Sequence, residues 1–167
     1  MAKIGHVHLK VRDLVLAESL YHHFLGFEVV ERFGKTYSFL SSGDTHHDIA
    51  LQHVGHGASL PEQDAVGLAH TAFEVSNKLA FAQSYLAFKD GGIPVQALDQ
   101  RIAWVLSLRD PSGNGVQVYV DTRGEADGVA FWEGKDRPLN KSQILAALDN
   151  VDTLGKVPSH VGGYYKF

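Results

Sequence analysis

The chain has 167 residues, a formal net charge of −4 with neutral histidines, and 10 histidines but no cysteine. This balance of charge offers no basic surface for nucleic acid, and the absence of cysteine excludes disulfides and thiolate chemistry. No apolar run approaches the length needed to cross a membrane. We therefore expect a soluble, cytoplasmic protein, in which the number of histidines is the one unusual feature of the composition.

The first strand-like stretch, GHVHLKV at residues 5–11, raises the question of what its histidines do. Alternate side chains of a strand point to opposite faces. Val7, Leu9 and Val11 therefore share an apolar face, whereas His6 and His8 share the other face with a lysine. An apolar face packs against a core, and the paired imidazoles on the opposite face are candidate ligands.

The elements that follow form a module of one strand, one helix and three strands. Helical spacing of apolar residues predicts a helix over 14–25, which ends at Gly26. Alternating apolar residues and intervening turn residues then predict three strands at 27–33, 35–41 and 47–54.

The same order of elements returns after a polar loop. A strand is predicted at 70–75, a helix at 78–92, and three more strands in IPVQAL, IAWVLSL and GVQVYV. Such an internal repeat indicates a duplicated module, with module one at 3–55 and module two at 67–121. We predict an α+β fold in which two tandem βαβββ modules form a curved, partly open mixed sheet around a central cavity. Residues 122–167 form a C-terminal extension with a short helix near 141–148.

A duplicated module can build a site from the polar faces of its strands. If the two modules curve toward each other, these faces line a shared concavity. The residues on them are His6, His8, His70, Glu74, Gln117 and Tyr119.

The fragments GHVHLKVRDL with YHHFLGFE, GLAHTAFEV and LRDPSGNGVQVY occur in an order and spacing that resemble the vicinal oxygen chelate superfamily. This superfamily includes glyoxalases, bleomycin resistance proteins and extradiol dioxygenases, and the resemblance covers roughly residues 3 to 121. THHDIAL and LRDPSGNG look most like the catechol-cleaving extradiol dioxygenases.

The resemblance implies a metal site at three matching positions, which are His6, His70 and Gln117. The extradiol pattern has a glutamate at the third position, so that two histidines and a carboxylate hold Fe(II) and leave positions open for substrate and O₂. A glutamine supplies an oxygen ligand without the negative charge. We expect a divalent metal, Fe(II) or Mn(II), at this site.

Neighbouring positions match the extradiol pattern only in part. The resemblance implies that His47 acts as the acid/base. Gln100 and Ser107 stand where the pattern has a histidine and a tyrosine, so we expect weak or no cleavage of unsubstituted catechol. Gln100 is a candidate substrate contact. His8 either contacts substrate or supports a ligand, and Tyr119 either bonds a ligand oxygen or fills the cavity wall.

These observations favour an extradiol dioxygenase-like protein that acts on a catechol-type aromatic and forms a homodimer. One alternative is a non-catalytic protein of the bleomycin-resistance type, which uses the same cavity to sequester a small molecule. A glyoxalase- or epimerase-like lyase ranks third. That class draws metal ligands from both halves of the chain. Ala50 occupies the position in the first module that corresponds to Gln117, and an alanine cannot bind a metal ion.

Overall fold

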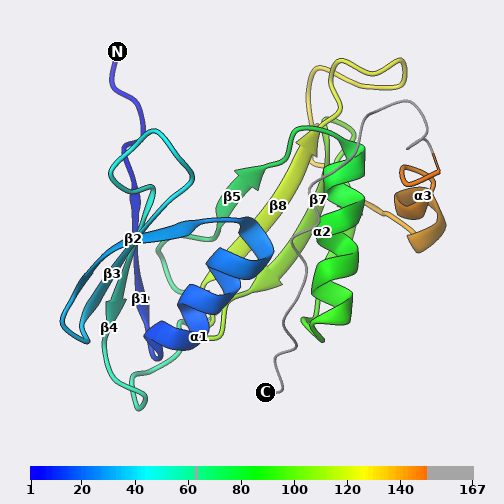
Figure 1. Ribbon diagram of the computed structural model, residues 1–167. Helices are drawn as coiled ribbons and strands as arrows, with labels where there is room; N and C mark the ends of the chain where they lie inside the picture. Colours follow the sequence, from blue (N-terminus) through cyan, green and yellow to red (C-terminus); the bar gives the residue numbers. More distant parts are fainter. Residues whose placement is uncertain (63, 150–167) are drawn as a thin grey trace. The chain divides into compact units, whose positions relative to one another are not determined.

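The structure is a computed structural model that describes residues 1–62 and 64–149. It divides into two compact units, the first comprising Met1–Thr71 with Arg109–Val116 and the second Ala72–Leu108 with the chain from Gln117 onward. Figure 1 shows the elements of both units.

The first unit contains a four-stranded sheet with the order β1-β4-β3-β2, in which β1 and β4 are parallel. Its elements are β1 (Val7–Val11), α1 (Leu14–Ser19), a π-helical turn η1 (Leu20–Phe24), β2 (Glu28–Phe33), β3 (Tyr37–Ser41) and β4 (Ile49–His53). The three strands predicted after the helix are thereby confirmed, each within a few residues of its predicted ends.

One face of this sheet forms the core of the first unit. Leu9 and Val11 of β1 pair in register with Leu51 and His53 of β4, and both are buried, as is Leu51. The side chain of Asp13 accepts a hydrogen bond from Leu16 N–H and so caps the start of α1.

The single regular helix predicted over 14–25 is wrong in its second half, where η1 replaces the α-helix. Leu20 and Tyr21 are both buried there, although adjacent residues of a regular α-helix point about 100° apart. The wider turn accommodates both side chains in the core. Gly26, at φ +76°, then reverses the chain.

The second unit contains a five-stranded sheet with the order β5-β8-β7-β6-β9. Its elements are β5 (Thr71–Glu74), α2 (Lys78–Asp90), β6 (Gln96–Asp99), β7 (Ala103–Arg109), β8 (Gly115–Asp121), β9 (Arg137–Pro138) and α3 (Lys141–Leu145). The predicted short helix of the extension is present as α3. The two-residue edge strand β9 was not predicted, because its residues carry no alternation of apolar and polar side chains.

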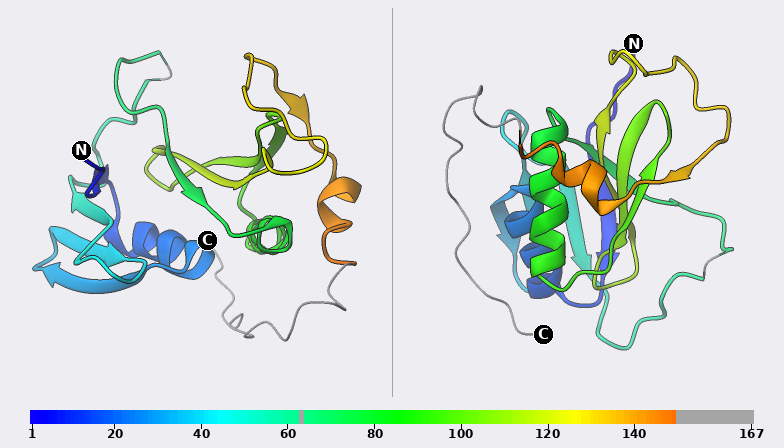
Figure 2. Two further views of the ribbon diagram at one scale, coloured as in Figure 1. Left: turned by 90° about the horizontal axis from the view of Figure 1, so that it is seen from above. Right: turned by 90° about the vertical axis from the view of Figure 1, so that its right-hand side faces the viewer.

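Helix α2 covers one face of the second sheet (Figure 2). The side chain of Asn77 caps its start by accepting from Ala80 N–H. Phe81 and Phe88 are fully buried, and the ring centroids of Phe81 and Trp104 on β7 lie 5.9 Å apart. Packing of the apolar helix face thus leaves the opposite face of this sheet for polar residues.

The two units have the same topology. The strand order β1-β4-β3-β2 of the first sheet corresponds strand by strand to the order β5-β8-β7-β6 of the second. The predicted α+β class and the two βαβββ modules are confirmed, and the strands form two partly open sheets. Within residues 1–62 and 64–149, no helix combines the length and the apolar character that a membrane span requires.

The chain from Asp110 to Asn114 forms a tight turn, with Gly113 at φ +82°. Asp110 is 4 % exposed and accepts hydrogen bonds from the backbone N–H groups of Ser112 (2.8 Å) and Asn114 (2.9 Å) and from Asn114 Nδ2 (2.8 Å). The hydroxyl of the buried Tyr21 lies 3.4 Å from the same carboxylate, and burial followed by this charge raises the pKa of Tyr21. The turn is thereby fixed to η1 within the first unit.

Candidate functional site

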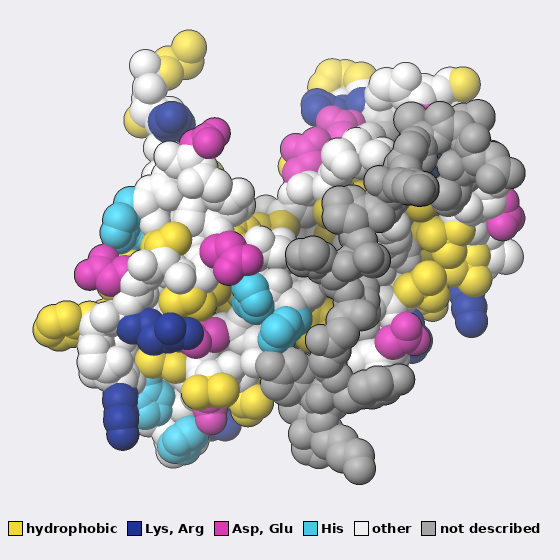
Figure 3. All heavy atoms as spheres, in the orientation of Figure 1, with side chains coloured by type: hydrophobic (Ala, Val, Ile, Leu, Met, Phe, Trp, Pro, Cys, Tyr) yellow, Lys and Arg dark blue, Asp and Glu magenta, His cyan; other side chains and the backbone are white. Residues whose placement is uncertain are grey.

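The first strand presents its histidines as its alternation predicts. In β1, Leu9 is buried while His8 and Lys10 are exposed, and His6 lies exposed directly before the strand. Histidine side chains are visible on the surface of the first unit in Figure 3. The imidazole of His6 is therefore accessible to a ligand.

His47 lies beside His6, as its proposed role requires. The two ring centroids are 4.6 Å apart, and the ring of Phe39 on β3 lies 5.0 Å from that of His47. Partial burial, together with the neighbouring rings of His6 and His46, lowers the pKa of His47. This shift favours the neutral imidazole, which can accept a proton.

A chain of polar contacts orients the ring of His47. Nε2 of His46 lies 3.2 Å from the carboxylate of Glu31, and Nδ1 of His46 lies 2.9 Å from Nδ1 of His47. A carboxylate only accepts hydrogen bonds, so a neutral His46 that donates Nε2–H to Glu31 has its acceptor lone pair on Nδ1. His47 then donates its Nδ1–H to His46, and its own Nε2 keeps a free lone pair. This tautomer is the one that a general base needs.

Aromatic side chains continue the same face of the first sheet. Tyr37 and Phe39 are stacked, with centroids 6.4 Å apart and an interplanar angle of 12°. The ring of His8 lies 6.0 Å from that of Tyr37 in an edge-on arrangement. Together these rings offer an apolar surface against which another aromatic ring can pack.

Gln117 lies on the polar face of β8 in the second unit. Val116 and Val118 on either side of it are buried, whereas Gln117 is half-buried. Its Nε2 donates a hydrogen bond to Oγ of Ser107 on β7 at 3.1 Å. Because the amide nitrogen is held in this way, Oε1 is the atom left available as a metal ligand.

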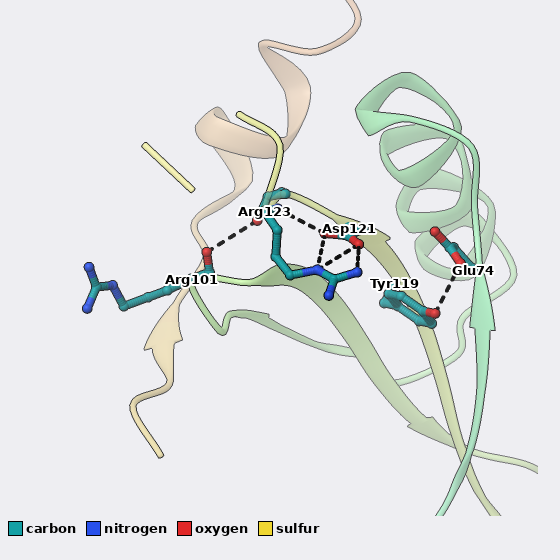
Figure 4. A network of polar contacts seen from close by, with 6 residues as sticks. Glu74, Arg101, Tyr119, Asp121 and Arg123 are labelled. Atoms are coloured by element: carbon teal, nitrogen blue, oxygen red, sulfur yellow. Dashed lines mark hydrogen bonds and ion pairs between the residues drawn. The ribbon is translucent and has the colours of Figure 1, made fainter. Parts of the chain in front are cut away.

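Tyr119 follows Gln117 on the same face and contacts Glu74 on β5 (Figure 4). Its hydroxyl donates to the Glu74 carboxylate at 3.2 Å. Partial burial and the nearby charge of Glu74 raise the pKa of Tyr119, so the phenol keeps its proton. Arg123 forms an ion pair with Asp121 further along, at the end of β8.

The remaining candidate residues have fewer defined partners. His70 is exposed and directly precedes β5, at the position in the second module that His6 has in the first. Gln100 is half-buried between β6 and β7, where its backbone N–H donates to the carbonyl of Ala103. His6 and His70 belong to the first unit, and Gln117 to the second.

No group of three or more His, Cys, Asp or Glu residues that could hold a metal ion occurs among residues 1–62 and 64–149. The amide oxygen of Gln117 belongs to another class of donor, since amide oxygens bind hard divalent cations.

Several residues of the site did not emerge from the sequence. Tyr37 and Phe39 were missed, although their alternation in β3 indicates that they share one face of that strand. Because β3 pairs with β4 and β4 with β1, this is the face that carries His8. In contrast, no periodicity connects Glu31 with His46, which meet only through the folding of β2 against the loop before β4.

Comparisons with known proteins agree with this architecture. Residues 3–118 match the family described as the Glyoxalase/Bleomycin resistance protein/Dioxygenase superfamily. The chain is 33% identical over 122 residues to a biphenyl-2,3-diol 1,2-dioxygenase of Rhodococcus globerulus, covering 71% of this chain and 63% of the relative. It is 25% identical over 146 residues to a catechol-2,3-dioxygenase of Bacillus subtilis, covering 87% of this chain and 49% of the relative. The chain thus spans between half and two thirds of the lengths of these curated relatives.

Solved structures show the same fold at lower identity. A glyoxylase/bleomycin resistance protein/dioxygenase domain from a Frankia species has a TM-score of 0.64 at 24% identity, covering 75% of this chain and 96% of that one. A lactoylglutathione lyase from Agrobacterium tumefaciens has a TM-score of 0.58 at 22% identity, covering 75% and 98%. The duplicated module, the strand order and the match over residues 3–118 lead to one conclusion: the chain belongs to the glyoxalase/bleomycin resistance protein/dioxygenase superfamily.

Proposed function

We propose that this protein binds a divalent metal ion, Fe(II) or Mn(II), together with a catechol-type aromatic, and that it is related in mechanism to the extradiol dioxygenases. The observation that carries the proposal is the position of His47, whose ring lies 4.6 Å from that of His6. The similarity to a biphenyl-diol and a catechol dioxygenase supports the same class of ligand. The homodimer and the cytoplasmic location expected from the sequence stay predictions.

In this proposal His6, His70 and Gln117 hold the metal. When bound, the ion supplies a Lewis-acidic centre that the two vicinal oxygens of a diol can chelate. The orientation of the Gln117 amide by Ser107 fits this role, because it leaves Oε1 free.

The protein's own groups bind and deprotonate the diol. His47 accepts a hydroxyl proton at Nε2, and the contact of its Nδ1 with His46 keeps that nitrogen unprotonated beforehand. The stacked rings of Tyr37 and Phe39 support the face of the aromatic ligand. His8 and Tyr119 are the proposed polar contacts to the ligand, with Gln100 as a further contact.

A second function is favoured by one observation: residues 1–62 and 64–149 contain no group of three or more His, Cys, Asp or Glu residues that could hold a metal ion. A binding protein of the bleomycin-resistance type would use the same aromatic face to sequester a ligand without a metal. Its ligand affinity would not respond to metal ions, and this property separates the two functions.

Catechol is expected to bind the metal-loaded protein at least tenfold more tightly than the metal-free protein. The extra affinity arises because vicinal oxygens chelate the ion. Titration calorimetry of both forms measures it, and resorcinol, whose hydroxyls cannot chelate one ion together, serves as the matched control. Equal catechol affinities in the two forms would contradict the proposal and favour the binding protein.

Unsubstituted catechol is still expected to be cleaved weakly or not at all, since Gln100 and Ser107 lack the groups of the extradiol pattern.

A further inference from the structure

A cavity lies at the far end of β1 from His6, within the first unit. It has a volume of about 470 Å³, which falls in the range of small-molecule sites. Lys10 and Arg12 line it, together with Ser112 and Asn114 of the tight turn. Lys10 lies four residues beyond His6, which corresponds to roughly 13 Å of extended strand. The cavity therefore lies at the opposite end of β1 from His6.

Hydrogen bonds from several segments build the walls of this cavity. The guanidinium of Arg12 donates through Nε to the carbonyl of Ala58 at 2.6 Å, and the Arg12 backbone N–H donates to Oγ of Ser112 at 2.8 Å. Nδ2 of Asn114 donates to the carbonyl of Lys10 at 3.1 Å. The loop after β4 and the tight turn are thus both attached to the end of β1, which makes the cavity a defined feature of the fold.

The opposite wall of the cavity is apolar. It is formed by Val54, Leu60 and Pro61. Val54 and Leu60 are 39% and 50% exposed, so their side chains present apolar surface to an entering molecule. A ligand that buries this surface gains affinity from the hydrophobic effect.

Two cationic side chains, those of Lys10 and Arg12, line the cavity. Among residues 1–62 and 64–149, no carboxylate oxygen lies within 4.0 Å of the charged nitrogen atoms of Lys10 or Arg12. The nearby carboxylate of Asp110 is buried and accepts from Ser112 and Asn114. The carboxylate of Asp13 caps Leu16 and lies 3.9 Å from His56.

From this combination we infer that the cavity binds a small organic carboxylate with a compact apolar body. The carboxylate lies against Lys10 and Arg12, whose positive charges attract it. The apolar body packs on Val54, Leu60 and Pro61. This site goes beyond the proposed metal-dependent function and does not require a metal ion.

The test is a calorimetric titration of benzoate into the wild-type protein and two charge-reversal variants. Lys10→Glu is expected to weaken benzoate binding tenfold or more, because it replaces an attractive charge by a repulsive one. Lys35→Glu, which makes the same change at an exposed lysine in the turn between β2 and β3, is expected to leave the affinity unchanged. Benzamide, which has the same shape without the charge, is expected to bind at least tenfold more weakly than benzoate.

Thermal unfolding of both variants tests whether Lys10→Glu folds. If it does not fold, Lys10→Met replaces it in the same titration, and a smaller loss of benzoate affinity is expected. Inorganic phosphate, added as a competitor, tests whether the anion alone is recognised; weaker binding than that of benzoate is expected. Three results would overturn the inference: no benzoate binding at millimolar concentration, equal affinities for benzoate and benzamide, or an affinity that Lys10→Glu leaves unchanged.

Discussion

Gln117→Glu is expected to raise the affinity of the protein for Fe(II) or Mn(II) by tenfold or more. The substitution keeps the length of the side chain and would add one negative charge beside the divalent ion, whereas the proposed ligands His6, His70 and Gln117 are all neutral when they bind a metal. At short range and at an intermediate dielectric constant, the attraction between the added carboxylate and the ion contributes about 1–4 kcal/mol. A contribution of about 1.4 kcal/mol corresponds to a tenfold change in affinity. Ser107 tolerates the change, because its hydroxyl can rotate and donate to a carboxylate.

Calorimetric titration of metal into the apo proteins measures this effect. Gln83→Glu, at an exposed position of α2, adds the same charge away from the site and is the matched control. It should bind metal as the wild type does. If Gln117→Glu also leaves the affinity unchanged, residue 117 is not a ligand position, and the function as a metal-free binding protein gains support.

Asp110→Ala is expected to lower the free energy of unfolding by about 3 kcal/mol or more. The buried carboxylate accepts hydrogen bonds from Ser112 and Asn114 and lies against the Tyr21 hydroxyl. Alanine would leave the backbone N–H groups of Ser112 and Asn114 without this acceptor, and each unsatisfied buried polar group costs about 1–3 kcal/mol. The tight turn would also lose its attachment to η1.

Urea unfolding, followed by circular dichroism, measures this loss of stability. Asp44→Ala removes an exposed aspartate in the loop before β4 and is expected to change the free energy of unfolding by less than about 0.5 kcal/mol. Asp110→Asn, which keeps one acceptor oxygen, should lie between the wild type and Asp110→Ala. If Asp110→Ala and Asp44→Ala were equally stable, the hydrogen bonds of the turn would not contribute to folding.

The fold could be predicted well because it depends on periodicities that the sequence displays. Alternation placed Leu9 and Val11 in the core and His8 on the accessible face, and the structure confirms both. The repeated order of elements predicted two equal modules, and the two sheets have the same strand order. The second half of the helix at 14–25 was wrong, since only the packing of adjacent Leu20 and Tyr21 distinguishes η1 from a regular helix.

The details of the site were less predictable, because they depend on pairs of side chains from different elements. Ser107 was interpreted from the sequence as a lost tyrosine, whereas the structure shows that its hydroxyl accepts from the Gln117 amide. Two of the departures from the extradiol pattern, Gln117 and Ser107, are thus physically connected through one hydrogen bond. Likewise, His46 lies in a turn with no distinctive pattern, and only the structure reveals its contacts with Glu31 and His47.

Metal retention tests the central claim most directly. The protein is incubated with Mn(II), passed through a desalting column, and analysed for metal per chain. The wild type is expected to retain about one ion per chain, whereas His6→Ala and His70→Ala should retain little. His56→Ala, at an exposed histidine in the loop after β4, should retain as much as the wild type. Equal retention by all four proteins, or none by the wild type, would contradict a metal site built on His6 and His70.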